Sequence, residues 1–464
     1  MSLFERRAAL LFFSTALVLF GVQSYNGYVS KTVFAPTVGG SYKEAEVGEI
    51  RYINPVLAQT DAEKSVSRLI FSSLIRLDGD KIIPDAAERW ETSDGGKKYT
   101  FFLRKDILFS DGKPLTAQDV VTTVNLIKTP ELKSPLLKTW NEVAVSANGD
   151  YEVSFTLPKS YGPFIFNCNF GIIPAHLSDV DFSKKLTGSG IYQFVKSKNT
   201  GKIIKEVDLK RNPFYYQSPA LVEKLTFNFY PTADEAKKAF EKNKRFDALS
   251  NAFSQDGKNY SFPTSKRLAL ILNVRNDKLK DKAVRQVILE GGKLDQKLQL
   301  NLFVPDNQLQ RSKAEEIKRN LIDRNIDVTI NALNPVKLQD ILDSKSYELL
   351  LYGFDPGYDR DPYLFWHSSQ LENMNFAGWS DKKTDIMLED ARLIEDKTER
   401  NKKYDEFFER IKSEDLIYFY DPIEYNFILR DRIKSFAPIT GIEASSRYFN
   451  ISSWFVNEKR VKKT

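Results

Sequence analysis

The sequence has few of the residues on which metal and redox chemistry depends. It contains a single cysteine, Cys168, and two histidines, His176 and His367, among 464 residues. A lone cysteine excludes an intrachain disulfide and a thiolate metal cluster, and its position between Phe166 and Phe170 predicts a buried packing residue. Two histidines far apart in the chain indicate neither a catalytic set nor a zinc site. We therefore expect no cofactor.

A strong charge of one sign is also missing. Lys and Arg number 68 and Asp and Glu number 62, which leaves a formal net charge of +6 over the whole length. The densest basic run, residues 459–463, is interpreted as a solvated tail, so no nucleic-acid partner is expected. The chain is long enough for two to four domains, and its 33 Phe and 21 Tyr favour β-rich packing and an aromatic-lined cleft.

One uncharged apolar run, residues 8–22, lies at the N-terminus behind Arg6 and Arg7. Its length is at the border between a signal-peptide core and a short membrane span. The basic pair holds the N-terminus in the cytoplasm, so everything after Gln23 is expected to be exported. No small-residue cleavage site and no lipid-accepting cysteine follows the run. We expect an uncleaved signal anchor; a cleaved signal, giving a secreted protein, stays open.

Periodicity indicates the elements that follow. Residues 23–44 have no clear period and are predicted to be a tether, and residues 49–55 a short strand. Clean alternation predicts strands at 99–104 and 151–157. Thr116, with an acidic residue three positions on, predicts the cap of a helix. From residue 268 onward, predicted strands alternate with predicted helices, which is typical of an α/β domain.

Several separate strings, in order, carry a resemblance to a known family. They include residues 84–90, 94–104 and 109–121 (FSDGKPLTAQDVV), followed by GSGIY at 188–192 and LKRNP at 209–213. On these strings the chain resembles the family 5 extracellular solute-binding proteins, the oligopeptide-, dipeptide- and nickel-binding group of ABC importers. Most of the matching residues are turns and helix starts, so the resemblance predicts the fold more directly than the ligand.

The resemblance implies a two-lobed α/β fold of the type II periplasmic-binding-protein kind, with an additional smaller domain and the N-terminal anchor before it. Lobe I would be discontinuous. The implied segments are residues 1–22 as signal anchor, 23–44 as tether, 45–65 with 172–255 and 422–456 as lobe I, 66–171 as the appended domain, and 256–421 as the second ligand lobe, lobe III.

The resemblance also places a ligand site in lobe III, where the family has an acidic residue just before a proline. The corresponding stretch here is residues 353–370, GFDPGYDRDPYLFWHSSQ. Alignment back from Pro362 favours Tyr358 and Asp359 as the cleft-facing pair. The full set of candidate ligand-binding residues is Tyr358, Asp359, Asp361, Trp366, His367, Asn375 and Trp379. The stretch departs from the family's Ala-Asp-Tyr pattern, and Arg360 could neutralise a neighbouring acid.

Other interpretations of these residues remain. Asp361 is equally well placed to cap a helix that begins near Pro362, and Trp366 and Trp379 are at least as well suited to core packing. The function implied is peptide capture by hinge closure and delivery to a membrane permease, on the extracytoplasmic face and without enzymatic activity. The alternative is an anchored surface, assembly or signalling protein that has a filled cleft. A hydrolase would need Asp359 and Asp361 as an acid/base pair, for which adjacent acids on one loop are poorly placed.

Overall fold

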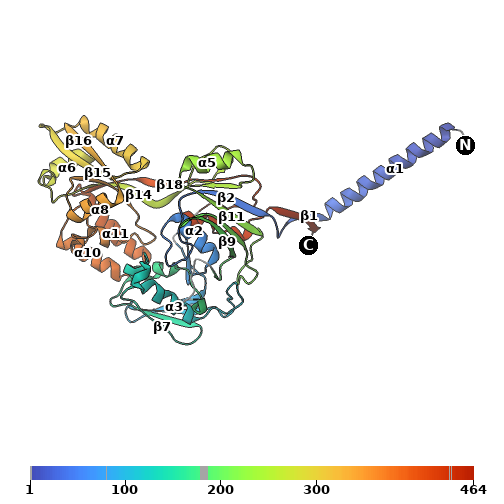
Figure 1. The fold of residues 1–464 in the computed structure, drawn as a ribbon, viewed down its shortest axis with the longest axis horizontal. Coiled ribbons are helices and arrows are strands. Elements are labelled where there is room, and N and C mark those ends of the chain that lie inside the picture. The colour runs from blue at the N-terminus through green and yellow to red at the C-terminus, as the bar shows by residue number, and fades with distance from the viewer. Residues whose placement is uncertain (1–2, 80, 178–185, 438, 440, 464) are drawn as a thin grey trace.

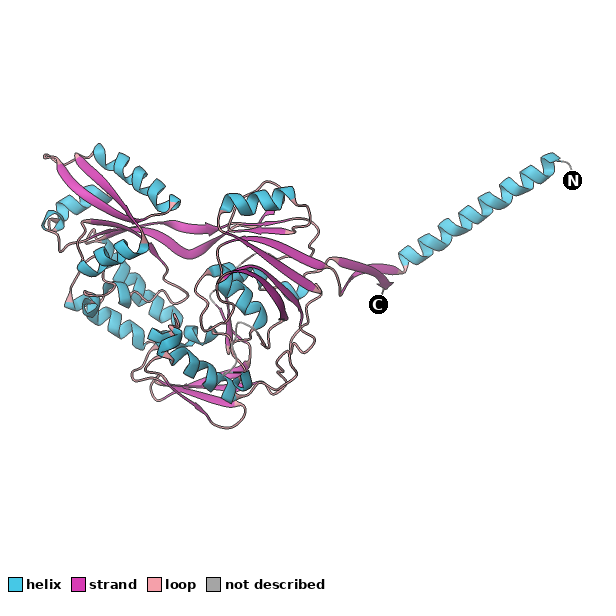
Figure 2. Cartoon of the chain, in the orientation of Figure 1, coloured by secondary structure: helices cyan, strands magenta, loops and turns pink. Residues whose placement is uncertain are grey.

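The structure is a computed structural model, and it describes residues 3–79, 81–177, 186–437, 439 and 441–463. Two halves lie side by side, and a long helix extends away from one of them (Figure 1). Each half is built on its own sheet with helices packed against it (Figure 2). The chain is therefore a mixed α/β protein, as the sequence predicts.

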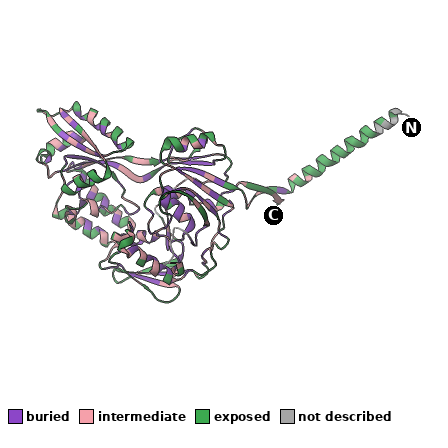
Figure 3. Cartoon of the chain, viewed as in Figure 1, coloured by how far each residue is buried: buried purple, intermediate pink, exposed green. Residues whose placement is uncertain are grey.

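The N-terminal helix is longer than the expected anchor. Helix α1 (Leu3–Ser30) continues past Val22 because residues 23–30 contain no proline to stop it. Its stretch Leu10–Ser30 is long and apolar enough to cross a membrane, as signal sequences near an N-terminus also can be, and none of it is buried. Figure 3 shows α1 exposed along most of its described length.

Residues 23–44, predicted to be a tether, form regular structure instead. After α1, strand β1 (Thr32–Thr37) pairs antiparallel with β20 (Asn457–Lys462), with Thr32 opposite Lys462. The expected solvated tail is therefore part of a two-stranded sheet, which we call the basal ribbon, at the base of α1 (Figure 1). The ribbon pairs strands that are far apart in the sequence. Local periodicity contains no signal for such a pairing, so the sequence did not predict it.

Strand β2 (Ser41–Val47) is also missing from the prediction, although it lies in the middle of a sheet. Its inward face carries Glu44 and Glu46, which are 0% and 1% exposed. Apolar residues at these positions would have indicated a strand, and the glutamates hide that pattern. Both carboxylates pair with the fully buried Arg447. The strand predicted at 49–55 is not formed; Ile50 makes only an isolated bridge to Ile204.

The half next to the basal ribbon contains a seven-stranded sheet in the order β13-β19-β12-β2-β11-β10-β9. Strand β2 runs parallel to β11 and β12, and the other pairs are antiparallel. Helix α2 contacts β9, and α5 contacts β2. The bounds are α2 (Asp61–Ile70), β9 (Tyr192–Thr200), β10 (Ile203–Arg211), β11 (Lys224–Tyr230), α5 (Ala233–Lys242), β12 (Ala248–Ser250), β13 (Lys258–Asn259), β19 (Phe427–Leu429), η6 (Ala444–Tyr448) and η7 (Ile451–Ser453).

Residues 75–177 add a four-stranded antiparallel sheet in the order β5-β6-β8-β7 and a hairpin of β3 and β4. The predicted strands at 99–104 and 151–157 and the cap at Thr116 are confirmed. Cys168 is fully buried, as predicted. The bounds are β3 (Ile75–Asp78), β4 (Lys81–Pro84), β5 (Ala87–Ser93), β6 (Lys98–Leu103), α3 (Ala117–Lys128), η1 (Pro130–Leu132), α4 (Leu137–Trp140), β7 (Ala144–Ala147), β8 (Glu152–Thr156), η2 (Gly162–Asn169) and η3 (Ala175–Leu177).

The other half contains a five-stranded mixed sheet in the order β16-β15-β17-β14-β18. Apolar side chains on one face of this sheet pack in a cluster with α7, and those on the other face pack with α8, α10 and α11. The bounds are β14 (Phe262–Leu272), η4 (Asp277–Leu279), α6 (Lys282–Leu289), β15 (Leu298–Pro305), α7 (Gln308–Ile322), β16 (Ile326–Leu333), α8 (Pro335–Ser344), β17 (Leu349–Phe354), α9 (Tyr363–Trp366), η5 (Ser368–Gln370), α10 (Lys382–Leu393), α11 (Lys397–Lys412) and β18 (Ile417–Tyr425).

Two long antiparallel strands, β14 and β18, run between the halves (Figure 1). Their register is irregular between Pro263 and Arg267 and again between Arg267 and Ala269. The domain limits expected from the sequence stay a prediction. One apolar cluster includes residues of both 45–65 and 66–171, so these two segments share a core.

Candidate functional site

The candidate ligand site is a cavity of about 800 Å³ where the two halves join, which we call the junction cavity. A volume of this size is within the range of pockets that enclose small ligands. Its wall is made by the crossing strands, the loop after β17, the ends of α6 and α11, and Ile442 from the other half. The residues that line it are Pro263–Ser265, Arg267, Leu289, Glu290, Phe354, Pro356–Tyr358, Arg360, Phe408, Glu409, Ile411, Lys412, Asp415, Ile417–Phe419, Pro422 and Ile442.

Strand β18 presents an edge to the junction cavity. Ile417, Tyr418 and Phe419 are consecutive and all line it, although side chains alternate between the faces of a strand. The cavity must therefore border the strand's edge. Among the described strands, β18 pairs with β14 alone, so its other edge carries unpaired backbone groups. Such an edge can accept an extended chain by strand addition.

Charged groups of both signs line the junction cavity. Arg267 lies on the crossing strand β14, and its Nε is buried without a hydrogen-bond partner in the part of the chain that the structure describes. Glu290, Glu409 and Asp415 supply carboxylates. Burial, followed by the charge of Glu290, raises the pKa of Asp415 above its ordinary value. The cavity can thus interact with a ligand that carries both a carboxylate and a cationic group.

Of the predicted ligand residues, Tyr358 lies in the junction cavity. Its side chain is 8% exposed, and it packs against the apolar cluster of the other half. Burial, aided by the nearby Glu443 and opposed by Arg68, raises the pKa of Tyr358 to about 12. The hydroxyl has no hydrogen-bond partner among the described residues. Tyr358 therefore lies at the boundary between the halves.

Asp359 is engaged in a buried ion pair, which does not favour the predicted capture of an ammonium group. Arg400, fully buried, donates from Nε to Asp359 Oδ1 at 2.8 Å, and Tyr404 donates to Oδ2 at 3.2 Å. Burial raises the pKa of Asp359, although the Arg400 hydrogen bond opposes this. Arg360, suspected as the neutralising cation, instead pairs with Asp405 at 3.0 Å.

Asp361 also has protein partners, and they come from both halves. It accepts a hydrogen bond at 3.0 Å from the backbone of Tyr363, the first residue of α9, although the N-cap position of that helix is Pro362. Its other oxygen accepts from Arg392 Nε at 2.9 Å and from the Tyr161 hydroxyl at 3.2 Å. Tyr161 precedes η2 in the other half, so Asp361 helps to hold the halves together.

The remaining candidates pack within their own half. Trp366 is 2% exposed in the apolar cluster beside Phe407, and Trp379 packs against the same cluster. Asn375 is fully buried and donates to the carbonyls of Trp366 at 3.1 Å and Trp379 at 2.8 Å. This arrangement is a packing role, so the structure does not place these three in the junction cavity.

His367 is likewise engaged within its own half. It is 7% exposed, stacks on Tyr363, and bonds to Ser369 at 2.8 Å and to Glu389 at 3.3 Å. It does not line the junction cavity. Within the described ranges, no group of three His, Cys, Asp or Glu side chains is placed to hold a metal ion.

Close contacts join the halves beside the site. Lys266 on β14 forms an ion pair of 2.6 Å with Asp61 at the start of α2. On the other side, η2 meets the link between α10 and α11, where a Cβ added at Gly162 would be 2.1 Å from the carbonyl oxygen of Ile394. Only glycine permits this approach. The halves are therefore in contact on two sides of the junction.

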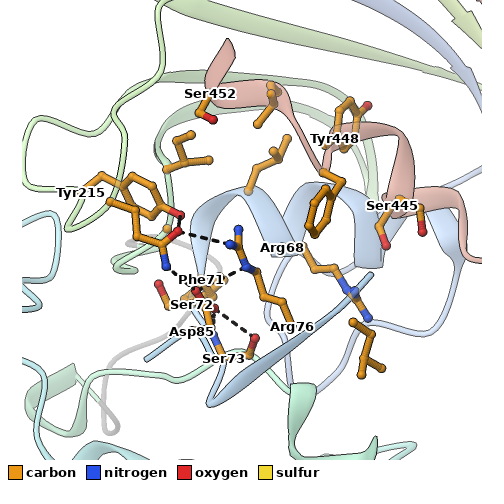
Figure 4. Close-up of a pocket in the computed structure, with 18 of the residues that line it drawn as sticks. Arg68, Phe71, Ser72, Ser73, Arg76, Asp85, Tyr215, Ser445, Tyr448 and Ser452 are labelled. Atoms are coloured by element: carbon orange, nitrogen blue, oxygen red, sulfur yellow. Dashed lines mark hydrogen bonds and ion pairs between the residues drawn. The ribbon is translucent and has the colours of Figure 1, made fainter. Parts of the chain in front are cut away.

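A second, smaller cavity of about 220 Å³ lies within the half that carries the basal ribbon. Figure 4 shows Asp85 and Arg76 in its wall, with Arg68, Tyr215 and several serines around them. Asp85 Oδ1 accepts from Tyr216 at 2.6 Å and lies 3.6 Å from Arg76 Nε. Asp85 is thus held by Tyr216 and by the charge of Arg76, whose Nη2 donates to Gln217 at 3.2 Å. We regard this network as support for α2 and β3.

Sequence reasoning missed Arg267, Asp415 and the edge of β18. Arg267 is one basic residue among many, and its lack of a partner is visible only in three dimensions. Asp415 has a left-handed backbone, with φ of 54°, in the turn before β18. An acidic residue directly before a predicted strand is a weak signal that could have drawn attention to this turn.

The chain is similar in sequence to known solute-binding proteins. Residues 81–290 match the model of the bacterial extracellular solute-binding proteins, family 5 middle. The oligopeptide-binding protein AppA of Bacillus subtilis is 24% identical over 503 aligned positions, covering 88% of this chain and 92% of AppA. The nickel-binding periplasmic protein of Escherichia coli is 27% identical over 198 positions, covering 41% of this chain and 37% of that protein.

Solved structures share the fold. The ABC transporter substrate-binding protein CtaP of Listeria monocytogenes superposes with a TM-score of 0.76 at 20% identity, covering 90% of this chain and all of CtaP. AppA of Bacillus subtilis, in complex with a nonapeptide, gives 0.70 at 19% identity over 91% of this chain and all of AppA. NikZ of Campylobacter jejuni, in complex with Ni(L-His), gives 0.70 at 22% identity over 89% of this chain and 99% of NikZ. The two-lobed binding-protein fold predicted from the sequence is confirmed.

Proposed function

We propose that this chain, which belongs to the family 5 extracellular solute-binding proteins of ABC transporters, binds an oligopeptide in the junction cavity and delivers it to a membrane permease. The members of this family bind solutes and are not enzymes. The observation that carries the peptide proposal is the junction cavity itself, which combines a free strand edge with charges of both signs and receives wall residues from both halves.

In this proposal each end of the peptide has a partner. Arg267 binds the terminal carboxylate, because its Nε is buried without a hydrogen-bond partner among the described residues. Glu290 and Asp415 bind the ammonium end, and the backbone of the peptide pairs with β18 at residues 417–419. Tyr358 covers the ligand as the halves close about β14 and β18. The AppA and Helicobacter pylori DppA structures, both solved with peptides, support this ligand class.

A nickel chelate is the competing ligand, since NikZ and the Escherichia coli nickel-binding protein are also relatives. The junction cavity contains no histidine among its lining residues, and His367 is buried elsewhere. Imidazole is a nitrogen ligand that suits nickel in proteins, so this lining does not favour the free ion, and the binding experiment decides between the chelate and a peptide. The role as an anchored assembly protein required a cleft filled by bulky side chains, and the open junction cavity argues against it.

Binding of a defined peptide mixture, with co-purified ligands identified by mass spectrometry, tests the proposal. Calorimetry on a recovered peptide then compares the free acid with its C-terminal amide. Arg267→Gln is expected to weaken binding of the free acid by roughly tenfold to a hundredfold, the effect of losing a charge-assisted hydrogen bond. The same variant should bind the amide about as well as the unmodified protein does.

The matched control is Arg245→Gln, an exposed arginine beyond α5 that does not line the cavity. It should leave both affinities unchanged. Failure to recover any peptide, together with saturable binding of a Ni–histidine chelate, would refute the peptide proposal. Equal losses for acid and amide in Arg267→Gln would show that Arg267 does not bind the carboxylate.

We further propose that α1 is retained as a protein anchor on the extracytoplasmic face. Its exposed apolar stretch Leu10–Ser30 supports this, as does the family's extracytoplasmic setting. In addition, α1 runs into the basal ribbon with one residue between them. The binding lobes would then stay close to the permease without a lipid modification.

A further inference from the structure

The basal ribbon begins where the apolar helix ends. Helix α1 stops at Ser30, β1 starts at Thr32, and the backbone amide of Lys463 donates to the carbonyl of Lys31 at 2.9 Å. Tyr25 and Tyr28, in the last turns of α1, are 63% and 51% exposed. Tyrosine is enriched at the boundary between lipid and water. With α1 in a membrane, the end of the ribbon therefore lies at the headgroup level.

This end of the ribbon is strongly basic. Residues 31–37 and 457–463 contain five basic side chains, Lys31, Lys459, Arg460, Lys462 and Lys463, against the single acid Glu458. Among the described residues, none of the four lysines lies within ion-pair distance of a carboxylate. This excess is local, because the whole chain has a net charge of only +6.

Arg460 holds the ribbon against the helix. Its Nη1 donates to the Thr32 hydroxyl at 3.0 Å, and its guanidinium lies 4.4 Å from the centre of the exposed Phe34 ring and 6.0 Å from that of Tyr28. These contacts fix the orientation of the strand pair at the end of α1. The lysines therefore lie on an ordered strand pair and not on a disordered tail.

We propose that the basal ribbon binds the anionic phospholipid headgroups of the membrane that α1 enters. Lys31, Lys462 and Lys463 lie at the membrane end. Lys459 is three residues farther along the strand, about 10 Å away at the rise of a strand. That distance is close to the screening length at physiological salt, so Lys459 contributes least. The contact limits the tilt of the binding lobes above the bilayer.

The proposal goes beyond peptide capture and is independent of it, but it requires α1 to be retained. The test places the full chain in nanodiscs of phosphatidylcholine alone or with about a third phosphatidylglycerol, and follows amide hydrogen exchange of residues 32–37 and 457–463. In the anionic discs we expect exchange of the ribbon to be slower by about tenfold or more, because each near-surface lysine strengthens lipid contact roughly fivefold. The effect should disappear at high salt.

The triple variant Lys31→Gln, Lys462→Gln, Lys463→Gln should lose this protection. A control with three exposed lysines distant from the ribbon replaced, Lys238→Gln, Lys242→Gln and Lys293→Gln, should keep it. Thermal unfolding of both variants verifies that they fold. Equal exchange in the two lipids, or protection that survives in the ribbon variant, would overturn the proposal. So would equal protection by inorganic phosphate over neutral discs, which would indicate a free-phosphate site.

Discussion

The buried carboxylate of Glu46 gives the protein a measurable pH dependence. Glu46 is 1% exposed, lies 3.1 Å from Arg447 Nη2, and accepts a hydrogen bond from the Tyr425 hydroxyl at 3.2 Å. Burial raises its pKa from the ordinary 4.5 to about 7; Arg447 opposes this and Glu44 adds to it. Two carboxylates share one guanidinium here, so the second of them is only partly compensated.

The sign of the effect follows from proton binding. Between about pH 4.5 and pH 7, folded Glu46 holds a proton that the unfolded chain has released. The folded state then binds more protons than the unfolded state, so the free energy of unfolding falls as pH rises through this window. The separation of the two pKa values corresponds to a contribution of about 3 kcal/mol, present at the acidic end and lost above pH 7.

Glu46→Gln keeps the shape of the protonated side chain and removes the titration. We expect the variant to equal the unmodified protein near pH 4.5 and to exceed it by up to about 3 kcal/mol above pH 7. Urea unfolding of the full chain in detergent at several pH values measures this difference. Glu235→Gln on the exposed face of α5 is the control and should give a difference that does not change with pH. Parallel stability profiles for Glu46→Gln and the unmodified protein would refute the reasoning.

Two further predictions concern closure and the anchor. Gly162→Ala places a methyl group 2.1 Å from the Ile394 carbonyl oxygen, so the halves must separate there. Such overpacking costs about 1–3 kcal/mol, so the affinity for peptide should fall roughly tenfold. The radius of gyration of the protein with bound peptide should increase. The control is Gly27→Ala, because nothing lies within 4 Å of a Cβ added at Gly27. An unchanged radius of gyration with peptide in Gly162→Ala would contradict the assignment of this contact. N-terminal sequencing of the protein from membranes should recover residues before Gln23, whereas a uniform start after the apolar run would show that α1 is removed.

The parts of the fold that could be predicted are those whose hydrophobic pattern matches their local structure. β6 alternates between buried and more exposed side chains, β8 alternates apolar and polar residues in its sequence, and α3 begins at a cap in which the Thr116 amide donates to Asp119 at 2.7 Å. β2 and the basal ribbon were missed because their patterns depend on distant partners. In β2, glutamates are buried where apolar residues would be expected, because Arg447, which is far away in the sequence, forms ion pairs with them.

The candidate site was predicted less completely. The stretch 353–370 was expected to hold the ligand site, which stays a prediction; within it, Tyr358 lies in the junction cavity. Asp359 was expected to face a ligand, but Arg400 reaches it from α11, a contact that spans 41 positions. Trp366 and Asn375 could serve packing or binding from sequence alone, and burial favours packing.

The sequence by itself determined the family resemblance, the mixed α/β fold and the apolar N-terminal segment, because these depend on local strings and composition. The tertiary structure alone decided which charges are free. Whether Asp359 or Arg267 can meet a ligand depends on which opposite charge folds against it, and pairing over tens or hundreds of residues leaves no local signal. The same reason explains why the basic run at 459–463, predicted to be a solvated tail, becomes part of an ordered strand pair beside the apolar N-terminal helix.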